Sequence, residues 1–450
     1  MTIPKHKKFR PSEKFLINQF SDHHTIRGVQ WVKKIIHGVP ALRNRDCRRF
    51  FFGQLVSNIG SWMQLVALSW LVYDLTKSAF WVGAVAAAAS VPALVFSLFG
   101  GTIVDSFPKK QILLVTHIAA TLLALALGVL SQTNNLNITA IIIFSFITGI
   151  INSIYTPAHY AFLPELVDKN SLSSAISINA AVSSIGRVLG PALAGIYIKY
   201  SGVSGAFFIN AISYFAVIFA LLLIKNKGKV INQKINPLVA IKDGLHYSYY
   251  NPFARSILLY ATAASIFMLS FATIIPIIAE KIFHTGSVGM GNLHTAMGIG
   301  AITATIFSAY FSHKLSKLSL FLAGNFLFAF SLILLSLTTN FSLGLFLTFL
   351  AGLGLVLVTI VLSVMVQNVT APEYRGRVLS INFMIVGGIA FLGNLEIGYL
   401  TETFGPQIAI RINTLIMIAI GIYVFSIKNS LRQKQRAYNQ LISSSLRDSY

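Results

Sequence analysis

Twelve long apolar segments dominate this chain, and they constrain its fold more than any other feature. A membrane's hydrocarbon core, about 30 Å thick, is crossed by a helix of roughly 20 apolar residues. Only 11% of the 450 residues are charged, against about 25% in a typical soluble domain. We therefore expect an all-α membrane protein. Its predicted transmembrane helices are 50–73, 79–104, 111–131, 137–160, 173–198, 203–224, 254–279, 290–312, 317–338, 341–368, 377–400 and 405–427.

The Lys and Arg residues lie almost entirely on one side of these predicted helices. With a cytoplasmic N-terminus, thirty of the 35 fall in or at the edge of cytoplasmic segments. The outer loops hold Lys77, Lys199 and Lys281, while Arg187 and Arg411 fall within or at the edge of helices. This bias predicts a multi-pass membrane protein with both termini in the cytoplasm. A nucleic-acid binder would carry its charge on a folded patch, so we expect no nucleic-acid partner.

A polar segment divides the predicted helices into two sets of six. The predicted domains are a basic N-terminal arm 1–49, a six-helix bundle 50–224, a cytoplasmic linker 225–253, a second six-helix bundle 254–427 and a cytoplasmic tail 428–450. The arm either binds the anionic inner leaflet through amphipathic turns or stays disordered.

The two sets also resemble each other at a spacing of 203 residues. Gly149, Ser177–Asn179, Gly190, Gly195 and Gly202 recur as Gly352, Ser380–Asn382, Gly393, Gly398 and Gly405. Parallel repeats around a midplane cavity are typical of rocking transporters. The sequence therefore predicts two pseudo-symmetric bundles.

An ordered set of motifs resembles the major facilitator superfamily, and within it the transmembrane secretion effector branch. The motifs are Asn58–Gln64, Trp70–Ser78, Gly101–Asp105, Leu163–Val167, Gly186–Gly195, Asp243–Tyr247 and Pro372–Val378. That branch includes enterobactin-type siderophore exporters and macrolide efflux proteins. The resemblance implies a secondary transporter that exports a siderophore or a hydrophobic drug by alternating access, coupled to proton influx. We expect it to act as a monomer surrounded by membrane lipid.

The segment from Gly101 to Lys110 is similar to the superfamily's signature loop. The resemblance implies that Asp105 meets Arg375 or Arg377 when the inner side of the transporter is shut. Lys109 and Lys110 supply the basic residues that usually end this loop. Here Ser106 and Pro108 replace the usual basic residue and glycine, which indicates a weaker latch. The alternative is that this loop only sets the topology.

A glycine-proline motif, also similar to the superfamily's antiporters, lies in the fifth predicted helix. Gly186, Gly190 and Gly195 leave a groove in which another helix can approach closely, and Pro191 can bend the helix. The alternative interpretation is plain packing.

Buried charge is costly in a bilayer and usually faces a cavity. Arg187 and Glu396 are therefore candidate coupling or substrate residues. Glu396 would exchange protons or contact a cationic group of the substrate, unless it only reaches water at the outer end. Asp74 is a third candidate, with capping of the next turn as its alternative.

Other polar residues of the predicted helices carry weaker signals. We interpret His117 and His159 as structural, because neither has a carboxylate or second histidine at ligand spacing. Eight amide side chains either line a cavity or join helices by hydrogen bonds. These are Gln54, Asn58, Gln64, Asn152, Asn179, Gln367, Asn382 and Asn394.

Enzyme and cofactor signatures are missing from the sequence. The single cysteine, Cys47, excludes a disulfide framework, and there is no P-loop, HExxH pair or GxSxG elbow. We expect no metal, no cofactor and no catalytic residue, with a proton or sodium gradient as the energy source. Three alternatives stay open: an importer of the same fold, a polytopic membrane enzyme, and a sensor or scaffold that transports nothing.

Overall fold

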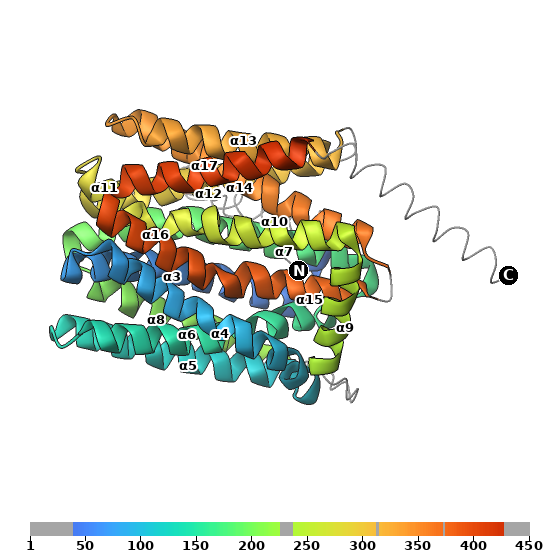
Figure 1. Ribbon diagram of the computed structural model, residues 1–450. Helices are drawn as coiled ribbons and strands as arrows, with labels where there is room; N and C mark the ends of the chain where they lie inside the picture. The colour runs from blue at the N-terminus through green and yellow to red at the C-terminus, as the bar shows by residue number, and fades with distance from the viewer. Residues whose placement is uncertain (1–38, 226–236, 312–314, 372–373, 427–450) are drawn as a thin grey trace, which may run out of the picture.

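The computed structural model describes residues 39–225, 237–311, 315–371 and 374–426. Residues 1–38 of the predicted N-terminal arm and the whole predicted C-terminal tail lie outside these ranges. Every regular element within them is helical (Figure 1). The long helices are α3 (Arg45–Thr76), α4 (Ala79–Ser106), α5 (Lys109–Gln132), α6 (Ile138–Phe162), α7 (Leu172–Ser201), α8 (Ser204–Leu223), α10 (Pro252–Phe267), α12 (Gly286–Phe311), α13 (Lys317–Leu335), α14 (Phe341–Val369), α16 (Ala390–Phe404) and α17 (Pro406–Ser426). The shorter ones are α2 (Pro40–Arg43), α9 (Pro237–Tyr250), α11 (Ile275–Lys281), α15 (Arg375–Met384) and the turns η1 (Leu163–Glu165), η2 (Lys169–Ser171), η3 (Leu269–Ile274) and η4 (Ile385–Ile389).

Eleven helical spans of the described residues are long and apolar enough to cross a membrane. The predicted segment 290–312, which is not among them, forms α12, a helix of 26 residues. Its Asn292 and His294 reduce its hydropathy, and it packs between α7 and α14 rather than standing apart. The chain is therefore a multi-pass membrane protein, and α12 is a long helix in contact with the others.

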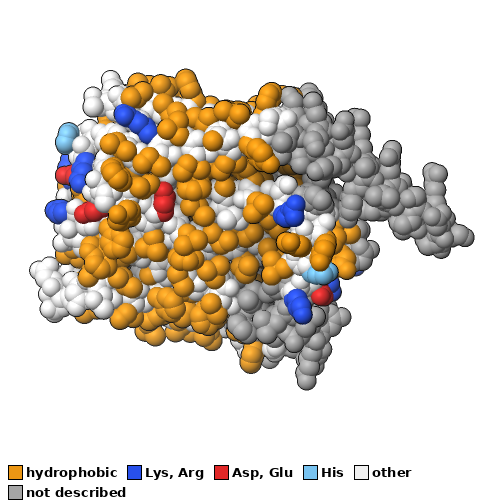
Figure 2. Space-filling model, viewed as in Figure 1, with side chains coloured by type: hydrophobic (Ala, Val, Ile, Leu, Met, Phe, Trp, Pro, Cys, Tyr) orange, Lys and Arg blue, Asp and Glu red, His pale blue; other side chains and the backbone are white. Residues whose placement is uncertain are grey.

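The long helices run side by side, and α9 lies across one end of them (Figure 1). We call this the α9 end and the opposite one the far end. Among α3 to α8, the N-terminal helices, α3 packs on α7 and α8, and α4 packs on α6. Among α10 to α17, the C-terminal helices, α14 packs on α12 and α13. The pairs α7–α12 and α4–α16 join the two sets. Figure 2 shows a broad apolar surface with most charged side chains toward its ends.

Polar caps fix where several helices begin. Asn44 accepts hydrogen bonds from the backbone N–H groups of Asp46 and Cys47, so α3 starts at Arg45, five residues before the predicted apolar segment. Asn137 and Asn340 cap α6 and α14 in the same way, close to the predicted starts. Hydropathy locates the lipid-facing part of a helix, whereas the cap locates its first turn.

Two of the predicted helices are interrupted. The segment predicted at 254–279 forms α10, the 3-10 turn η3 and α11, while 377–400 forms α15, the π-helical turn η4 and part of α16. The Ser265 hydroxyl donates to the carbonyl oxygens of Ile385 (3.1 Å) and Val386 (3.3 Å) in η4. Because a π turn loosens the usual backbone hydrogen bonds, Ser265 stabilises this irregular segment.

Glycines paired by the 203-residue repeat make equivalent contacts. Gly190 on α7 packs on α3 at Trp62, and Gly393 on α16 packs on α10 at Ile266. The next pair joins the two sets of helices, because Gly195 packs on α12 and Gly398 packs on α4.

The repeat also covers the ends of α7 and α16. Gly202 (φ 75°) and Gly405 (φ 85°) end these helices in the left-handed region, which glycine adopts without strain. The internal similarity therefore reflects matched packing and matched helix ends.

Candidate functional site

The glycine-proline motif of α7 lies between α3 and α12. A Cβ on Gly186 would lie 2.9 Å from Asn58 Cβ, and one on Gly190 would lie 2.5 Å from Trp62 Cβ, both on α3. On the other side of α7, a Cβ on Gly195 would lie 2.7 Å from the carbonyl oxygen of Ser287 on α12. Pro191 also contacts α12 through its carbonyl oxygen, which lies beside Gly291. The motif thus brings α7 close to a helix of each set.

Arg187 lies where these three helices meet. Its guanidinium lies 5.3 Å from the centre of the Trp62 ring, a cation–π contact. Its Nε is buried and has no hydrogen-bond partner. Its backbone carbonyl faces Gly298 of α12, and the neighbouring Val188 carbonyl accepts from Thr295 of the same helix at 3.2 Å. A half-buried cation whose buried Nε has no partner is suited to binding an anionic group.

At the far end, α4 and α16 are in tight contact. A Cβ on Gly83 would meet the Asn394 carbonyl oxygen and lie 3.1 Å from Gly398 Cα. The Asn394 side chain accepts from Thr273 at 2.8 Å and donates to Ser90 at 3.4 Å.

One turn beyond Gly398 on α16, Glu402 Oε2 accepts from the backbone N–H of Ala79 at 2.7 Å and so caps α4. These contacts, with those of Gly195, close the N-terminal helices against the C-terminal ones at the far end.

A buried hydrogen-bond network connects α3, α6 and α7 nearer the α9 end. The Tyr155 hydroxyl lies 3.0 Å from Gln54 Oε1 and 3.2 Å from His159 Nδ1. His159 Nε2 lies 2.8 Å from Asn179 Oδ1. Phe50 stacks on the His159 ring at 5.5 Å. Gln54 is 1% exposed, and its Nε2 has no partner.

A polar cavity of about 180 Å³ adjoins this network. It is lined by Gln54, Ser57, Asn58, Ser61, Thr116, His117, Ala120, Ile151, Asn152, Tyr155 and Tyr214. Three of the amides predicted to line a cavity, Gln54, Asn58 and Asn152, do so. Asn179 belongs to the network instead, and Gln64 accepts from Asn210 of α8 at 2.7 Å.

At the α9 end, Arg377 forms an ion pair with Asp243 of α9, at 3.2 Å between Nη1 and Oδ2. The structure does not describe the side chains of Asp105 and Arg375 or the packing of Gly101. The predicted latch therefore stays a prediction.

The basic end of the signature loop packs on α8. Lys109 is buried, and Lys110 Nζ donates to the Ile224 carbonyl at 2.6 Å, which holds α5 to the end of α8.

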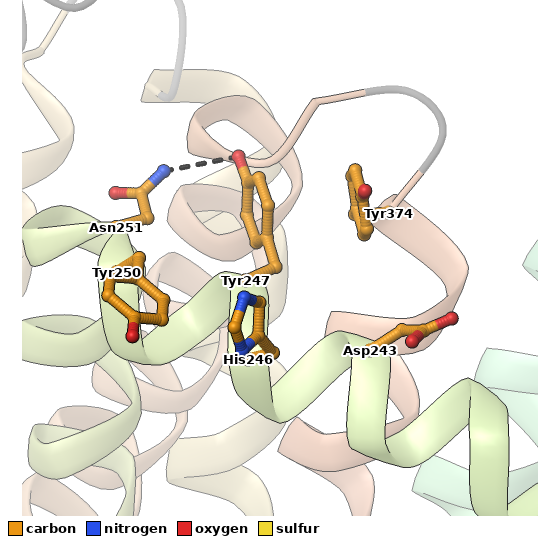
Figure 3. Close-up of a pocket in the computed structure, with 6 residues that line it drawn as sticks. All are labelled: Asp243, His246, Tyr247, Tyr250, Asn251 and Tyr374. Carbon is orange, nitrogen blue, oxygen red and sulfur yellow. Dashed lines mark hydrogen bonds between the residues drawn. The ribbon is translucent and has the colours of Figure 1, made fainter.

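A second cavity, of about 420 Å³, lies beside this ion pair and is lined by Asp243, His246, Tyr247, Tyr250, Asn251 and Tyr374 (Figure 3). The rings of Tyr247 and Tyr374 stack at 4.6 Å. The Tyr247 hydroxyl accepts from Asn251 Nδ2 and from the backbone N–H of Ala371, each at 3.1 Å. Tyr247 therefore fastens α9 to the segment that precedes α15.

Two of the predicted coupling residues have local partners. Glu396 accepts from Asn413 of α17 at 3.0 Å. Residues 394 and 398 contact α4, and at about 100° per residue Glu396 points to the opposite face of α16. Asp74 is exposed and pairs with Lys77 at 2.6 Å, and this bond raises the pKa of Lys77. Neither carboxylate lies at the contact between the two sets of helices.

Comparison with known proteins identifies the family. A family model described as "Transmembrane secretion effector" matches residues 37–446. The chain belongs to the transmembrane secretion effector family. The chain is thus a transporter-family protein and not an enzyme. Its described residues contain no group of three or more His, Cys, Asp or Glu side chains that could hold a metal ion.

Among its relatives, the "Staphyloferrin A transporter" of Staphylococcus aureus is 28% identical over 88% of this chain and 99% of that protein. "Macrolide efflux protein A" of Streptococcus pyogenes is 21% identical over 82% and 93%. Among solved structures, a peptide transporter has a TM-score of 0.71 at 12% identity, over 89% of this chain and 99% of that one. The nucleoside transporter NupG (D323A mutant) has 0.70 at 12%, over 85% and 100%. These structures share the fold.

Sequence reasoning missed the contacts of three residues of this chain. Tyr155 lies four residues before His159 on α6, a spacing that places both on one helix face and could have indicated their contact. Asp243 and Glu402 gave no such signal, because their partners are 134 and 323 residues away in the sequence.

Proposed function

We propose that this protein is a secondary transporter that exports an anionic siderophore across a bacterial inner membrane by alternating access, driven by proton influx. In this proposal twelve transmembrane helices form two bundles, α3–α8 and α10–α17. The α9 end faces the cytoplasm, as the Lys and Arg bias predicts. The contacts of Gly195, Gly398 and Glu402 then close the outer side.

The observation that carries the substrate class is the buried, unpartnered Nε of the half-buried Arg187. Its Nε has no partner, its guanidinium lies on Trp62 of α3, and its backbone carbonyl faces Gly298 of α12. Leaving a buried charged donor unsatisfied is costly unless a ligand completes it. A carboxylate or other oxyanion of a siderophore would complete it, whereas a hydrophobic macrolide would not need it. The staphyloferrin A transporter, among the relatives, supports the same choice.

A proton gradient supplies enough energy for this task. One proton crossing about 150 mV releases roughly 3.5 kcal/mol, which sustains a concentration gradient of a few hundred-fold for a neutral solute. The family resemblance supports the proton as the coupling ion.

Purified protein in oriented proteoliposomes tests the proposal. We expect a pH gradient to drive radiolabelled staphyloferrin A toward the side opposite the α9 end. Arg187→Gln should raise the KM at least tenfold, and Arg187→Lys should restore part of the affinity. The Trp62 contact and the planar guanidinium distinguish Arg from Lys, so full restoration is not expected.

The alternative functions give other results. Accumulation toward the α9 end would identify an importer, and no flux of any tested solute would favour a sensor or scaffold. Transport of a macrolide with no effect of Arg187→Gln would favour drug efflux.

A further inference from the structure

We propose that His159 is the site that binds the transported proton, with Tyr155 as the relay to the adjoining cavity and Gln54 as the partner that changes orientation. This inference rests on the proton coupling proposed above, and it names the residues that perform it. The coupling candidates singled out by sequence, Glu396 and Asp74, have partners outside the contact between the two sets of helices.

Both ring nitrogens of His159 face oxygen atoms. The Tyr155 hydroxyl donates to Gln54 Oε1, which can only accept, so the same hydroxyl oxygen accepts from His159 Nδ1–H. Asn179 Oδ1, also an acceptor, lies 2.8 Å from Nε2. An imidazole that donates from both nitrogens is an imidazolium. The network as it stands therefore fits the protonated form of His159.

The same groups also fit the neutral form after one rotation. If the Gln54 amide turns by 180°, its Nε2 donates to the Tyr155 oxygen, and the Tyr155 hydroxyl donates to an unprotonated His159 Nδ1. His159 Nε2–H still donates to Asn179. In the present orientation Gln54 Nε2 is buried without a partner. Each protonation state thus keeps the three hydrogen bonds, and the states differ by one proton and one amide rotation.

The cavity provides a path for the proton. Tyr155 and Gln54 line it, and Asn152 at its edge is exposed. A hydronium ion in the cavity gives a proton to the Tyr155 oxygen as the Tyr155 hydroxyl proton passes to His159 Nδ1. Water is left in the cavity, Tyr155 stays neutral, and His159 gains one positive charge.

The surroundings of His159 have few titratable groups that could replace it. His117 of α5 contacts Tyr155 edge to face at 5.2 Å, and Tyr160 of α6 lies 5.6 Å from the His159 ring. Tyr214 of α8 shares the cavity. Cys47 of α3 belongs to the same buried hydrophobic cluster as Phe50, which stacks on His159. The side chain of Asp105, on α4, lies outside the described residues. Charging both His159 and His117 would be opposed by their mutual repulsion.

Asn179 connects this site to the substrate residue. Arg187 lies eight residues further along α7, a rise of about 12 Å. His159 of α6 donates to Asn179 of α7, the helix that also contacts α12, and the positive charge of the imidazolium strengthens this hydrogen bond. Loss of the proton removes this charge assistance and reverses the hydrogen bonds of Tyr155 with Gln54 and His159. The Arg187 contacts do not move directly, so coupling runs through the weakened hold of α6 on α7.

Two transport modes in proteoliposomes separate coupling from binding. We expect His159→Gln to keep staphyloferrin A counterflow within threefold of wild type and to lose pH-driven accumulation more than tenfold. Substrate-dependent proton uptake, followed with entrapped pyranine, should be lost as well. His294→Gln, at a buried histidine of α12 outside the network, should keep both modes. Tyr155→Phe should slow pH-driven transport while leaving counterflow intact.

The outcomes distinguish this inference from the function it rests on. Wild-type protein without pH-driven accumulation would overturn the proposed coupling, whereas a His159→Gln variant with normal accumulation and proton uptake would overturn the His159 assignment alone. If His159→Gln does not fold, nitrogen-15 NMR of ring-labelled wild type replaces it. A His159 imidazolium signal at pH 6 that is lost by pH 9 supports the assignment, and an unchanging neutral ring contradicts it.

Discussion

Arg377 of α15 and Asp243 of α9 form an ion pair with 3.2 Å between Nη1 and Oδ2. Arg377 also lies 5.4 Å from the Tyr374 ring, which stacks on Tyr247 of α9. The linker helix is therefore held to the start of α15 by one ion pair and one aromatic stack. The sequence predicted a different partner for Arg377, the aspartate of the signature loop.

The Asp243→Asn substitution tests whether Arg377 pairs with Asp243 in one state and with Asp105 in the other. Both side chains are about two-fifths exposed, so the pair should contribute only about 0–1 kcal/mol and the melting temperature should change little. If Arg377 also meets Asp105 in the other state, Arg377→Gln should reduce transport further in the Asp243→Asn background. A double-mutant cycle between Asp105 and Arg377 with zero coupling would remove the predicted latch.

Gly195→Val should disturb the closed far end. The added Cβ would lie 2.7 Å from the Ser287 carbonyl, and overpacking of this kind costs about 1–3 kcal/mol. Gly398→Val, its repeat partner on α16, should act similarly because its Cβ would lie 3.0 Å from the Ala79 carbonyl. Gly387→Ala is the control, since its Cβ meets only Ala93 at 3.8 Å. Thermal unfolding and initial transport rates provide the measurements, and unchanged values in both valine variants would refute the close packing.

Glu402→Ala should weaken the start of α4. Loss of a charged cap on the Ala79 N–H should cost about 1 kcal/mol. A cysteine introduced at the far end, such as Lys281→Cys in a Cys47→Ser background, should also be labelled faster in the Glu402→Ala variant, because the cap joins α16 to α4. Asp74→Asn, which breaks an exposed pair with Lys77, is the matched control and should have almost no effect. Equal behaviour of the two variants would show that the cap does not stabilise closure.

Glu396→Gln should keep pH-driven transport. An amide at this position can still accept from Asn413, and Glu396 points away from α4. Glu396→Leu should instead lower stability by about 1–3 kcal/mol, because it leaves a buried amide unpaired. Loss of pH-driven transport in Glu396→Gln, with counterflow retained, would return the proton role to Glu396.

The sequence predicted the features that depend on local pattern. Hydropathy located the helices, and the repeat identified glycines that turned out to make matched contacts, such as Gly195 and Gly398. The breaks in the seventh and eleventh predicted helices were missed. The one in the eleventh, η4, is stabilised by Ser265 from another helix, 120 residues away in the sequence.

The side-chain partners of the site could not be predicted in the same way. Glu402 is an exposed carboxylate like any other until the fold brings it to Ala79. His159 was interpreted as structural because no carboxylate or second histidine lies at ligand spacing, and its neutral partners Tyr155 and Asn179 were not recognised from the sequence. Such contacts depend on how helices pack, which a single sequence does not specify.

Distances across both ends of the molecule test alternating access most directly. In a Cys47→Ser background, spin labels at Asp74 and Lys281 report on the far end, and labels at Lys169 and Lys317 report on the α9 end. Double electron–electron resonance at pH 6 and pH 8, with and without staphyloferrin A, should show one distance lengthening as the other shortens. Distances that stay fixed at both ends, or that change in the same direction, would contradict the account.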